Sequence, residues 1–278
     1  MNKIIDCNKI SLELKEELKK EISQISVKLK LVVIQVGSDE ASNVYIRNKQ
    51  KLCEEMGILC EHKKFLNITE EKLINEIRKL NVDKTVTGIL VQLPLPKEIN
   101  ETKVIEEILP EKDVDGLTSK NIGNLFSNNE SIVPCTALGI IKIIESLKED
   151  IAGLNAVVIG RSKLVGMPLI KLLLNKNVTV TVAHSKSKNL KNITQQADIL
   201  IVAIGKKEFI TKEYLKENVI IIDVGINRDN NKLYGDCNFV ECLEKCKYIT
   251  PVPGGVGKLT VIMLINNIIK AYYMQNKQ

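Results

Sequence analysis

The chain has 278 residues, 44% hydrophobic and 27% charged, a composition that excludes global disorder and predicts two domains with cores of their own. The 40 basic and 34 acidic residues leave a formal charge of +6, spread along the chain, and there are four Phe, six Tyr and no Trp. So few aromatic residues predict no nucleic-acid partner, and the lack of an apolar run near ~18 residues predicts no membrane span.

The seven cysteines are scattered, at positions 7, 53, 60, 135, 237, 242 and 246. No two of them form a CxxC pair, and the chain has only two histidines, so we expect no metal site. An odd number of scattered cysteines is typical of reduced thiols. We therefore expect a cytoplasmic protein.

The first part of the chain alternates helices and strands. Apolar residues three and four positions apart predict an amphipathic helix over 9–25. The elements expected after it are a strand over 31–36, a helix from 39 to 57, a strand over 58–65, a helix over 70–80, a strand over 86–91 and a short helix ending at Pro110. This alternation predicts a largely parallel sheet.

The second part of the chain repeats that pattern. A polar stretch over 121–131 is a candidate boundary, and a helix over 136–147 follows it. Strands are expected over 156–159, 178–182, 199–204 and 219–224, followed by a turn at 229–231, a glycine-rich loop over 251–257 and an apolar helix over 259–273. Two such series predict an α/β protein with two domains.

The turn after the strand over 156–159 has features of a dinucleotide-binding loop. Gly160 permits a tight turn, and the backbone N–H groups that follow it can face a pyrophosphate. The spacing departs from GxGxxG, because Ser162 stands at the middle glycine and Gly166 is displaced. An ordinary βα turn therefore stays open as an alternative.

The end of the next strand indicates which nicotinamide cofactor would bind. NAD-binding proteins usually place a carboxylate there for the ribose 2′-hydroxyl, but residues 182–188 contain none. Ser185, Lys186 and Lys188, with Arg161 in the first loop, suit a 2′-phosphate, which favours NADP over NAD. A solvated basic loop is the alternative.

One helix face carries residues that could do chemistry. Ser42, Tyr45 and Lys49 are three and four positions apart, so they share a face of the helix predicted over 39–57. Desolvation near an interior edge would make Lys49 useful as an acid or base. On this helix alone, a packed Tyr45 and a solvent-reaching Lys49 are the simpler interpretation.

Three loops add polar or unusually shaped groups. Gln92 follows a strand directly, at the edge where open parallel sheets bind ligands. Asp115, in a loop over 113–116, could accept N–H groups of a heterocycle, although a simple turn explains that loop equally well. The loop over 251–257 combines stiff prolines with glycines that permit close backbone approach.

Together these segments resemble the bifunctional methylenetetrahydrofolate dehydrogenase/cyclohydrolase family. They follow the family's order and cover nearly the whole chain. The matching segments are Ser42-x-x-Tyr45-x-x-x-Lys49, residues 88–96, 112–116, 134–136, 160–168, 223–227 and 251–257.

The resemblance implies a fold with two α/β domains flanking a cleft. Residues 1–120 plus 258–278 would form the folate-binding catalytic domain, to which the C-terminal helix returns, and residues 121–257 the Rossmann-like NADP-binding domain. It also implies two activities: oxidation of 5,10-methylenetetrahydrofolate to 5,10-methenyltetrahydrofolate with NADP, and hydrolysis of that product to 10-formyltetrahydrofolate. A homodimer acting in purine biosynthesis is the further implication.

The resemblance also implies a role for each matching position. Lys49 would be the acid/base group of hydrolysis, with Gln92 as its hydrogen-bond partner and Tyr45 stacked on the folate. Further substrate contacts would come from Ser42, Asp115, Pro251, Gly254 and Gly255, and cofactor contacts from Thr136, Gly160, Arg161, Ser162, Ser185 and Ile226.

The chain departs from the family pattern at a few positions: Ala137, Ser187, Cys237 and Lys258-Leu259. None of them removes a proposed catalytic group. Two other functions stay open, a dehydrogenase without hydrolysis and a catalytically silent nucleotide-binding protein. Lys49 and Gln92 count against the first of these. The second is disfavoured by a full set of intact residues: Ser42, Tyr45, Lys49, Gln92 and Asp115.

Overall fold

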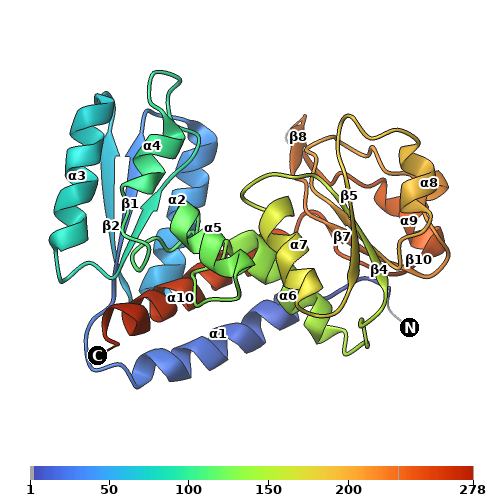
Figure 1. Ribbon diagram of the computed structural model, residues 1–278, viewed down its shortest axis with the longest axis horizontal. Helices are drawn as coiled ribbons and strands as arrows, with labels where there is room; N and C mark the ends of the chain where they lie inside the picture. Colours follow the sequence, from blue (N-terminus) through green and yellow to red (C-terminus); the bar gives the residue numbers. More distant parts are fainter. Residues whose placement is uncertain (1–2, 231, 278) are drawn as a thin grey trace. The chain divides into compact units, whose positions relative to one another are not determined.

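The computed structural model describes residues 3–230 and 232–277, and of residues 40–42 it describes the backbone alone. The chain forms two compact α/β units, each built on a parallel sheet (Figure 1). The three-strand unit comprises Lys15–Cys135 and Val261–Gln278, and the five-strand unit comprises Met1–Leu14 and Thr136–Thr260. Helices α1 (Cys7–Ser23) and α10 (Val256–Gln275) contribute to both units. The predicted α/β class with two domains is confirmed.

The sheet of the three-strand unit has the order β2-β1-β3, with strands β1 (Lys30–Val36), β2 (Leu59–Phe65) and β3 (Gly88–Val91). Alternate residues of β1 face opposite sides of the sheet. Val32 and Ile34 belong to the core that includes α3 (Glu70–Val82). On the other face, Gln35 Nε2 donates to Asn43 Oδ1 of α2 (Glu40–Glu55) at 2.9 Å. The sheet therefore lies between α3 and α2.

Helix α3 shows how local sequence sets an element's limits. The Thr69 hydroxyl oxygen accepts a hydrogen bond from the Lys72 N–H at 3.4 Å, which caps the first turn. The positions predicted to face inward, Leu73, Ile77 and Leu80, are all buried.

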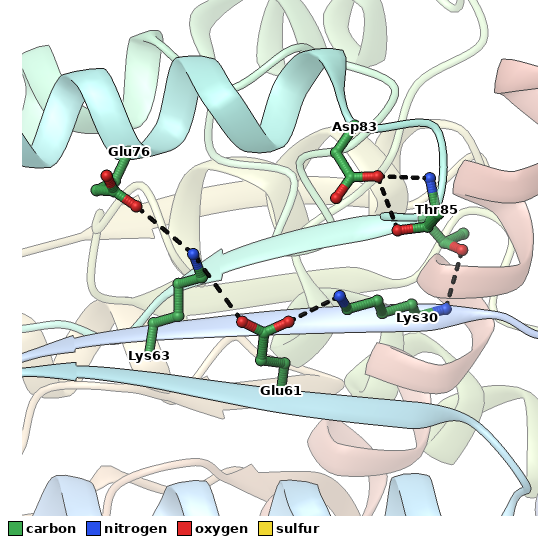
Figure 2. Close-up of polar contacts among 7 residues, drawn as sticks. Lys30, Glu61, Lys63, Glu76, Asp83 and Thr85 are labelled. Carbon is green, nitrogen blue, oxygen red and sulfur yellow. Dashed lines mark hydrogen bonds and ion pairs between the residues drawn. The ribbon is translucent and has the colours of Figure 1, made fainter.

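Charged side chains join the edge strand β2 to its neighbours (Figure 2). The Glu61 carboxylate lies 2.7 Å from Lys30 Nζ and 3.9 Å from Lys63 Nζ, and Lys63 Nζ lies 3.5 Å from the Glu76 carboxylate of α3 (Figure 2). Each such half-exposed pair contributes little to stability. These linked ion pairs nevertheless show that Glu61 and Lys63 point to the side of the sheet that α3 covers.

The C-terminal helix α10 packs within the three-strand unit over its later turns. Gln275 Nε2 donates to the carbonyl oxygens of Thr87 and Glu111, at 2.8 and 2.9 Å. The predicted return of this helix to the first domain is confirmed. The unit also contains α4 (Glu101–Glu106) and α5 (Ser119–Phe126), so the polar stretch predicted as a boundary begins as a helix.

The five-strand unit is a doubly wound parallel sheet with the order β10-β7-β6-β4-β5. Successive side chains along a strand point to opposite faces of the sheet, so each strand contributes to two hydrophobic cores. Val158 of β4 packs in one core with α6 and α7, while Val157 packs in the other with residues near α8 and α9. The elements are α6 (Cys135–Ser146), β4 (Asn155–Ile159), α7 (Gly166–Leu174), β5 (Thr179–Ala183), α8 (Leu190–Thr194), β6 (Ile199–Val202), η1 (Lys212–Tyr214), β7 (Val219–Asp223), the hairpin β8 (Asn227–Asp229) and β9 (Lys232–Tyr234), α9 (Phe239–Lys245) and β10 (Cys246–Ile249).

Several short elements of this unit have no counterpart among the predictions: α8, α9, η1 and β10. They span three to seven residues, too few for a helical or alternating pattern to be recognised with certainty in the sequence. Strand β10 also contains an exposed Lys247, which interrupts its apolar run. Its pairing with β7 depends on the tertiary fold rather than on a local signal.

Candidate active site

Lys49 and Gln92 form a direct pair in the three-strand unit. Lys49 Nζ donates to Gln92 Oε1 at 3.1 Å, and both side chains are half-buried. Gln92 Nε2 donates to the Leu93 carbonyl oxygen at 2.8 Å. Because only the amide nitrogen can donate to that carbonyl, the amide oxygen must face Lys49. The ammonium is thus held in place by a neutral acceptor, and its other N–H groups are directed elsewhere.

The sheet explains why these two residues meet. Gln92 follows β3 at its carboxyl end, and its N–H donates to the Ile34 carbonyl of β1 at 2.8 Å. Helix α2, which carries Lys49, follows β1 after a turn at Gly37 with φ +86°. In a parallel sheet the carboxyl ends share one edge, so the amide and the ammonium converge there.

Asp115 and Cys135 lie in the same neighbourhood. Cys135 Sγ is 3.7 Å from Asp115 Oδ1 and 3.6 Å from the Val114 carbonyl oxygen. Burial raises the pKa of the Cys135 thiol well above its usual range; the Asp115 charge raises it further, and the Lys49 charge opposes the shift. Cys135 is therefore a neutral thiol, and both Lys49 and Asp115 act on it electrostatically.

Tyr45 lies one turn before Lys49 on α2 and is 47% exposed. The alternative in which Tyr45 packs in the core does not fit this exposure. Ser42 belongs to the same helix, but its side chain lies outside the described part of the structure.

Asn267 supports this site and was missed from the sequence. Its Nδ2 donates to the carbonyl oxygens of Val114 and Val133, each at 2.8 Å, and the residue is fully buried. Gly116 adds to the constraint, because a Cβ atom there would lie 2.7 Å from the Ile132 carbonyl oxygen. The only local signal for Asn267 is a polar residue within an apolar helix, which does not identify its partners.

The turn between β4 and α7 forms a tight cradle in the five-strand unit. Gly160 has φ +124°, and a Cβ atom on Gly166 would lie 2.3 Å from the Gly160 carbonyl oxygen. The Ser162 hydroxyl oxygen accepts from the Val165 N–H at 3.2 Å, which holds the loop in shape. At the start of α7, Val165 provides no side-chain cap, the Met167 N–H donates to the Ser162 carbonyl oxygen at 3.0 Å, and Pro168 has no N–H. The positive end of the α7 dipole faces this turn, which therefore favours an anionic ligand such as a phosphate.

The loop after β5 lies beside this cradle. Strands β4 and β5 are neighbours, and Gly160 N–H donates to the Ala183 carbonyl at 2.9 Å. The loop is compact, because the Ser187 hydroxyl oxygen accepts from the His184 N–H at 2.9 Å. Ser185 is exposed next to it, and Arg161 is exposed in the first loop. This juxtaposition fits a 2′-phosphate.

The remaining predicted residues also belong to the five-strand unit. Ile226 is 46% exposed, and the Thr136 hydroxyl is 3.4 Å from that of Thr260. Gly254 has φ +97°, and a Cβ atom on Gly255 would lie 2.2 Å from the Pro251 carbonyl oxygen. The loop over 251–255 thus requires its glycines. Within residues 3–230 and 232–277, no cluster of three His, Cys, Asp or Glu suits a metal ion, and no helix is long and apolar enough to cross a membrane.

A doubly wound sheet with a phosphate cradle, joined in one chain to a unit with a lysine–amide pair, defines a nucleotide-dependent α/β enzyme. Residues 5–115 match the family model of the tetrahydrofolate dehydrogenase/cyclohydrolase catalytic domain, and residues 134–276 match that of its NAD(P)-binding domain. The chain belongs to this family, and the resemblance predicted from the sequence is confirmed.

Individual relatives match over nearly their full lengths. The bifunctional protein FolD of Listeria innocua is 50% identical over 98% of this chain and 97% of its own. The structure of bifunctional FolD from Campylobacter jejuni has a TM-score of 0.95 at 42% identity, covering 98% of this chain and 99% of that chain. FolD of Trypanosoma brucei, in complex with NADP and an inhibitor, has a TM-score of 0.93 at 32% identity, covering 99% and 98%.

Proposed function

We propose that this chain catalyses two consecutive reactions of folate one-carbon chemistry. The first is the NADP-dependent oxidation of 5,10-methylenetetrahydrofolate to 5,10-methenyltetrahydrofolate, and the second is hydrolysis of that product to 10-formyltetrahydrofolate. The observation that carries the proposal is the 3.1 Å hydrogen bond from Lys49 to Gln92, in a unit that matches the family's catalytic domain.

Lys49 is the acid/base group of the hydrolytic step. Water adds to the electrophilic methenyl carbon, and a proton must leave that water and reach the nitrogen that is released. An amine held at a fixed position can carry this proton. Gln92 accepts one N–H of Lys49 and so directs the rest of the amine toward the substrate.

Tyr45, Ser42 and Asp115 bind the folate in the three-strand unit. The exposed ring of Tyr45 offers a flat surface for stacking. The Asp115 carboxylate accepts N–H groups of the pterin, and the bonds from Asn267 to Val114 and Val133 hold its loop. Pro251, Gly254 and Gly255 contribute further substrate contacts.

NADP, when bound, supplies the hydride acceptor. Gly160 and Ser162 shape the cradle for its pyrophosphate, and Arg161 and Ser185 bind the 2′-phosphate. Thr136 and Ile226 complete the cofactor site.

The wider assignments rest on family membership. We place folate binding in residues 1–120 with 258–278 and NADP binding in residues 121–257. The protein is a homodimer in the cytoplasm, and its 10-formyl product serves purine biosynthesis.

Replacing Lys49 with Met tests this function. Loss of a positioned acid/base group should reduce hydrolysis of 5,10-methenyltetrahydrofolate by roughly 10²–10⁴-fold, followed as the loss of its absorbance. Lys51→Met, an exposed lysine on the same helix, is the matched control. Full hydrolysis by the Lys49 variant would contradict the role of Lys49.

Assays of the unmodified chain separate the other functions. A dehydrogenase without hydrolysis would oxidise the methylene substrate but not accelerate loss of the methenyl compound over buffer. A silent nucleotide-binding protein would bind NADP and turn over neither substrate. A clear preference for NAD at equal concentration would contradict the 2′-phosphate assignment.

A further inference from the structure

Two cysteines outside the proposed catalytic groups contact each other in the three-strand unit. Cys53 lies in the last turn of α2, Cys60 is the second residue of β2, and the two thiols are close enough to shift each other's pKa. The connection between the two elements is tight: the Ile58 N–H donates to the Cys53 carbonyl at 2.8 Å, and Gly57 has φ +72°. A short loop therefore holds the two residues close together at the contact between α2 and β2.

The pleat of β2 independently places Cys60 on the α2 side. Glu61 and Lys63 point toward α3 (Figure 2), so the alternate residues Cys60 and His62 point to the opposite face. His62 confirms that direction, because its Nε2 lies 3.0 Å from Gln35 Oε1 on the α2 face. Strand β2 thus holds Cys60 against α2.

The two thiols differ in exposure and in charge environment. Cys53 is fully buried and Cys60 is half-buried. Interaction with the Cys53 thiol lowers the pKa of the Cys60 thiol; burial opposes this shift, and the nearby positive charge of Lys49 adds to it. Interaction with the Cys60 thiol, together with burial, raises the pKa of Cys53. Cys60 is therefore the nucleophile that reacts first, and Cys53 is the protonated thiol that reacts with it afterwards, the resolving cysteine.

The chain contains a matched pair with the opposite environment. The Cys237 and Cys242 thiols also lie close enough for one to shift the pKa of the other, but both residues are buried, and the Cys242 thiol donates to the Ile210 carbonyl oxygen at 3.5 Å. The charges near Cys237 are the carboxylates of Asp223 and Asp236, which raise its pKa together with burial. Both pairs therefore have neighbouring thiols. Only the pair of Cys53 and Cys60 also has a partly exposed sulfur and a nearby positive charge, that of Lys49.

We propose that Cys53 and Cys60 form a modification site, a dithiol that hydrogen peroxide converts to an intramolecular disulfide beside Lys49. The Cys60 thiolate attacks one oxygen of the peroxide and breaks the O–O bond, giving a sulfenic acid and hydroxide, which takes up the Cys60 proton. The Cys53 sulfur then displaces the sulfenic hydroxyl, and its own proton leaves in water. Two thiols lose two electrons, and one peroxide becomes two waters.

Peptide mapping of the full chain tests the site. After peroxide treatment and alkylation of the remaining thiols, a protease that cleaves after glutamate separates Cys53 from Cys60 at Glu54 and Glu55. The expected product is residues 41–54 joined to residues 56–61, about 2 Da lighter than the two reduced peptides together. Cys60→Ser should abolish this product. Cys237 and Cys242 should remain reduced thiols, which the alkylating reagent modifies only after the chain is unfolded.

Two results would overturn the proposal. One is the absence of the linked peptides while Cys60 accumulates only sulfinic acid. The other is an equal or greater disulfide yield at Cys237 and Cys242, because exposure and the cation would then have no influence.

A functional readout rests on the role proposed for Lys49, which precedes Cys53 by one helical turn. Oxidation should lower cyclohydrolase turnover several-fold, and dithiothreitol should restore it. Cys60→Ser should match the untreated wild type and resist peroxide, and an equal loss in that variant would contradict any influence of the disulfide on Lys49. If the untreated chain lacks cyclohydrolase activity, the proposed function fails, whereas peptide mapping still decides the disulfide.

Discussion

Replacing Gln92 with Met would remove the acceptor that holds Lys49 while preserving most of the side-chain volume. The lost bond joins an amide oxygen to an ammonium at 3.1 Å. A hydrogen bond to a charged group contributes about 1.5–3 kcal/mol. Both side chains are half-buried, so the lower part of that range applies, about 1.5–2 kcal/mol. That energy corresponds to a roughly 10- to 30-fold lower kcat/KM for hydrolysis.

The assay follows loss of 5,10-methenyltetrahydrofolate over a range of pH, with thermal unfolding as the folding control. Gln92→Glu is the informative companion, because a carboxylate in the same place stabilises the Lys49 ammonium. Its hydrolysis should therefore rise at higher pH than that of the wild type. An unchanged pH profile for Gln92→Glu, or wild-type kcat/KM for Gln92→Met, would refute the coupling between these two residues.

Three further predictions follow from individual contacts. Asn267→Ala leaves the buried Val133 carbonyl without its side-chain donor and the Val114 carbonyl with only the weak Cys135 thiol, and should cost about 1–3 kcal/mol of unfolding free energy; a urea unfolding midpoint equal to that of the wild type would contradict this. Arg161→Gln should weaken NADP binding roughly tenfold and leave NAD unchanged, and fluorescence titration showing equal losses would exclude a 2′-phosphate contact. Burial, then the Lys64 charge, lowers the pKa of His62 below 6.5. The folded state therefore gains stability from neutral His62 above pH 6.5, and this contribution is lost as the pH falls from 6.5 through the pKa of the folded state. The His184→Gln variant retains His62 as its one histidine, and an NMR titration midpoint at or above 6.5 in that variant would contradict the prediction.

Much of the fold could be predicted from short patterns. Strand β1 is apolar except for Lys30 and Gln35, and it lies in the centre of its sheet. Helix α3 has apolar residues at helical spacing, and those positions are buried. Such elements are predictable because a strand or helix that buries one or both faces must repeat its apolar residues at its own period. The short elements α9 and β10 span only seven and four residues, so their apolar patterns do not stand out from those of a loop.

The candidate site was predictable only in part. Lys49, Gln92 and Asp115 stand in recognisable segments, and Gly160 follows an apolar strand. The contacts that these residues make could not be predicted from the sequence. The exposure of Tyr45 decides against a packed ring at that position, and Asn267 had no signal that linked it to the loop of Asp115.

The sequence by itself determined the βα alternation, the glycine-dependent turns and the family, because each follows from neighbouring residues or from motifs in a fixed order. The tertiary structure decided which side chains meet. Lys49 and its amide partner are 43 residues apart, and Asn267 lies 153 residues from the carbonyl of Val114. Cys60 faces Cys53 only because of the register and pleat of β2. Contacts of this kind depend on strand order and helix rotation, which are set by packing over the whole unit rather than by neighbours in the chain.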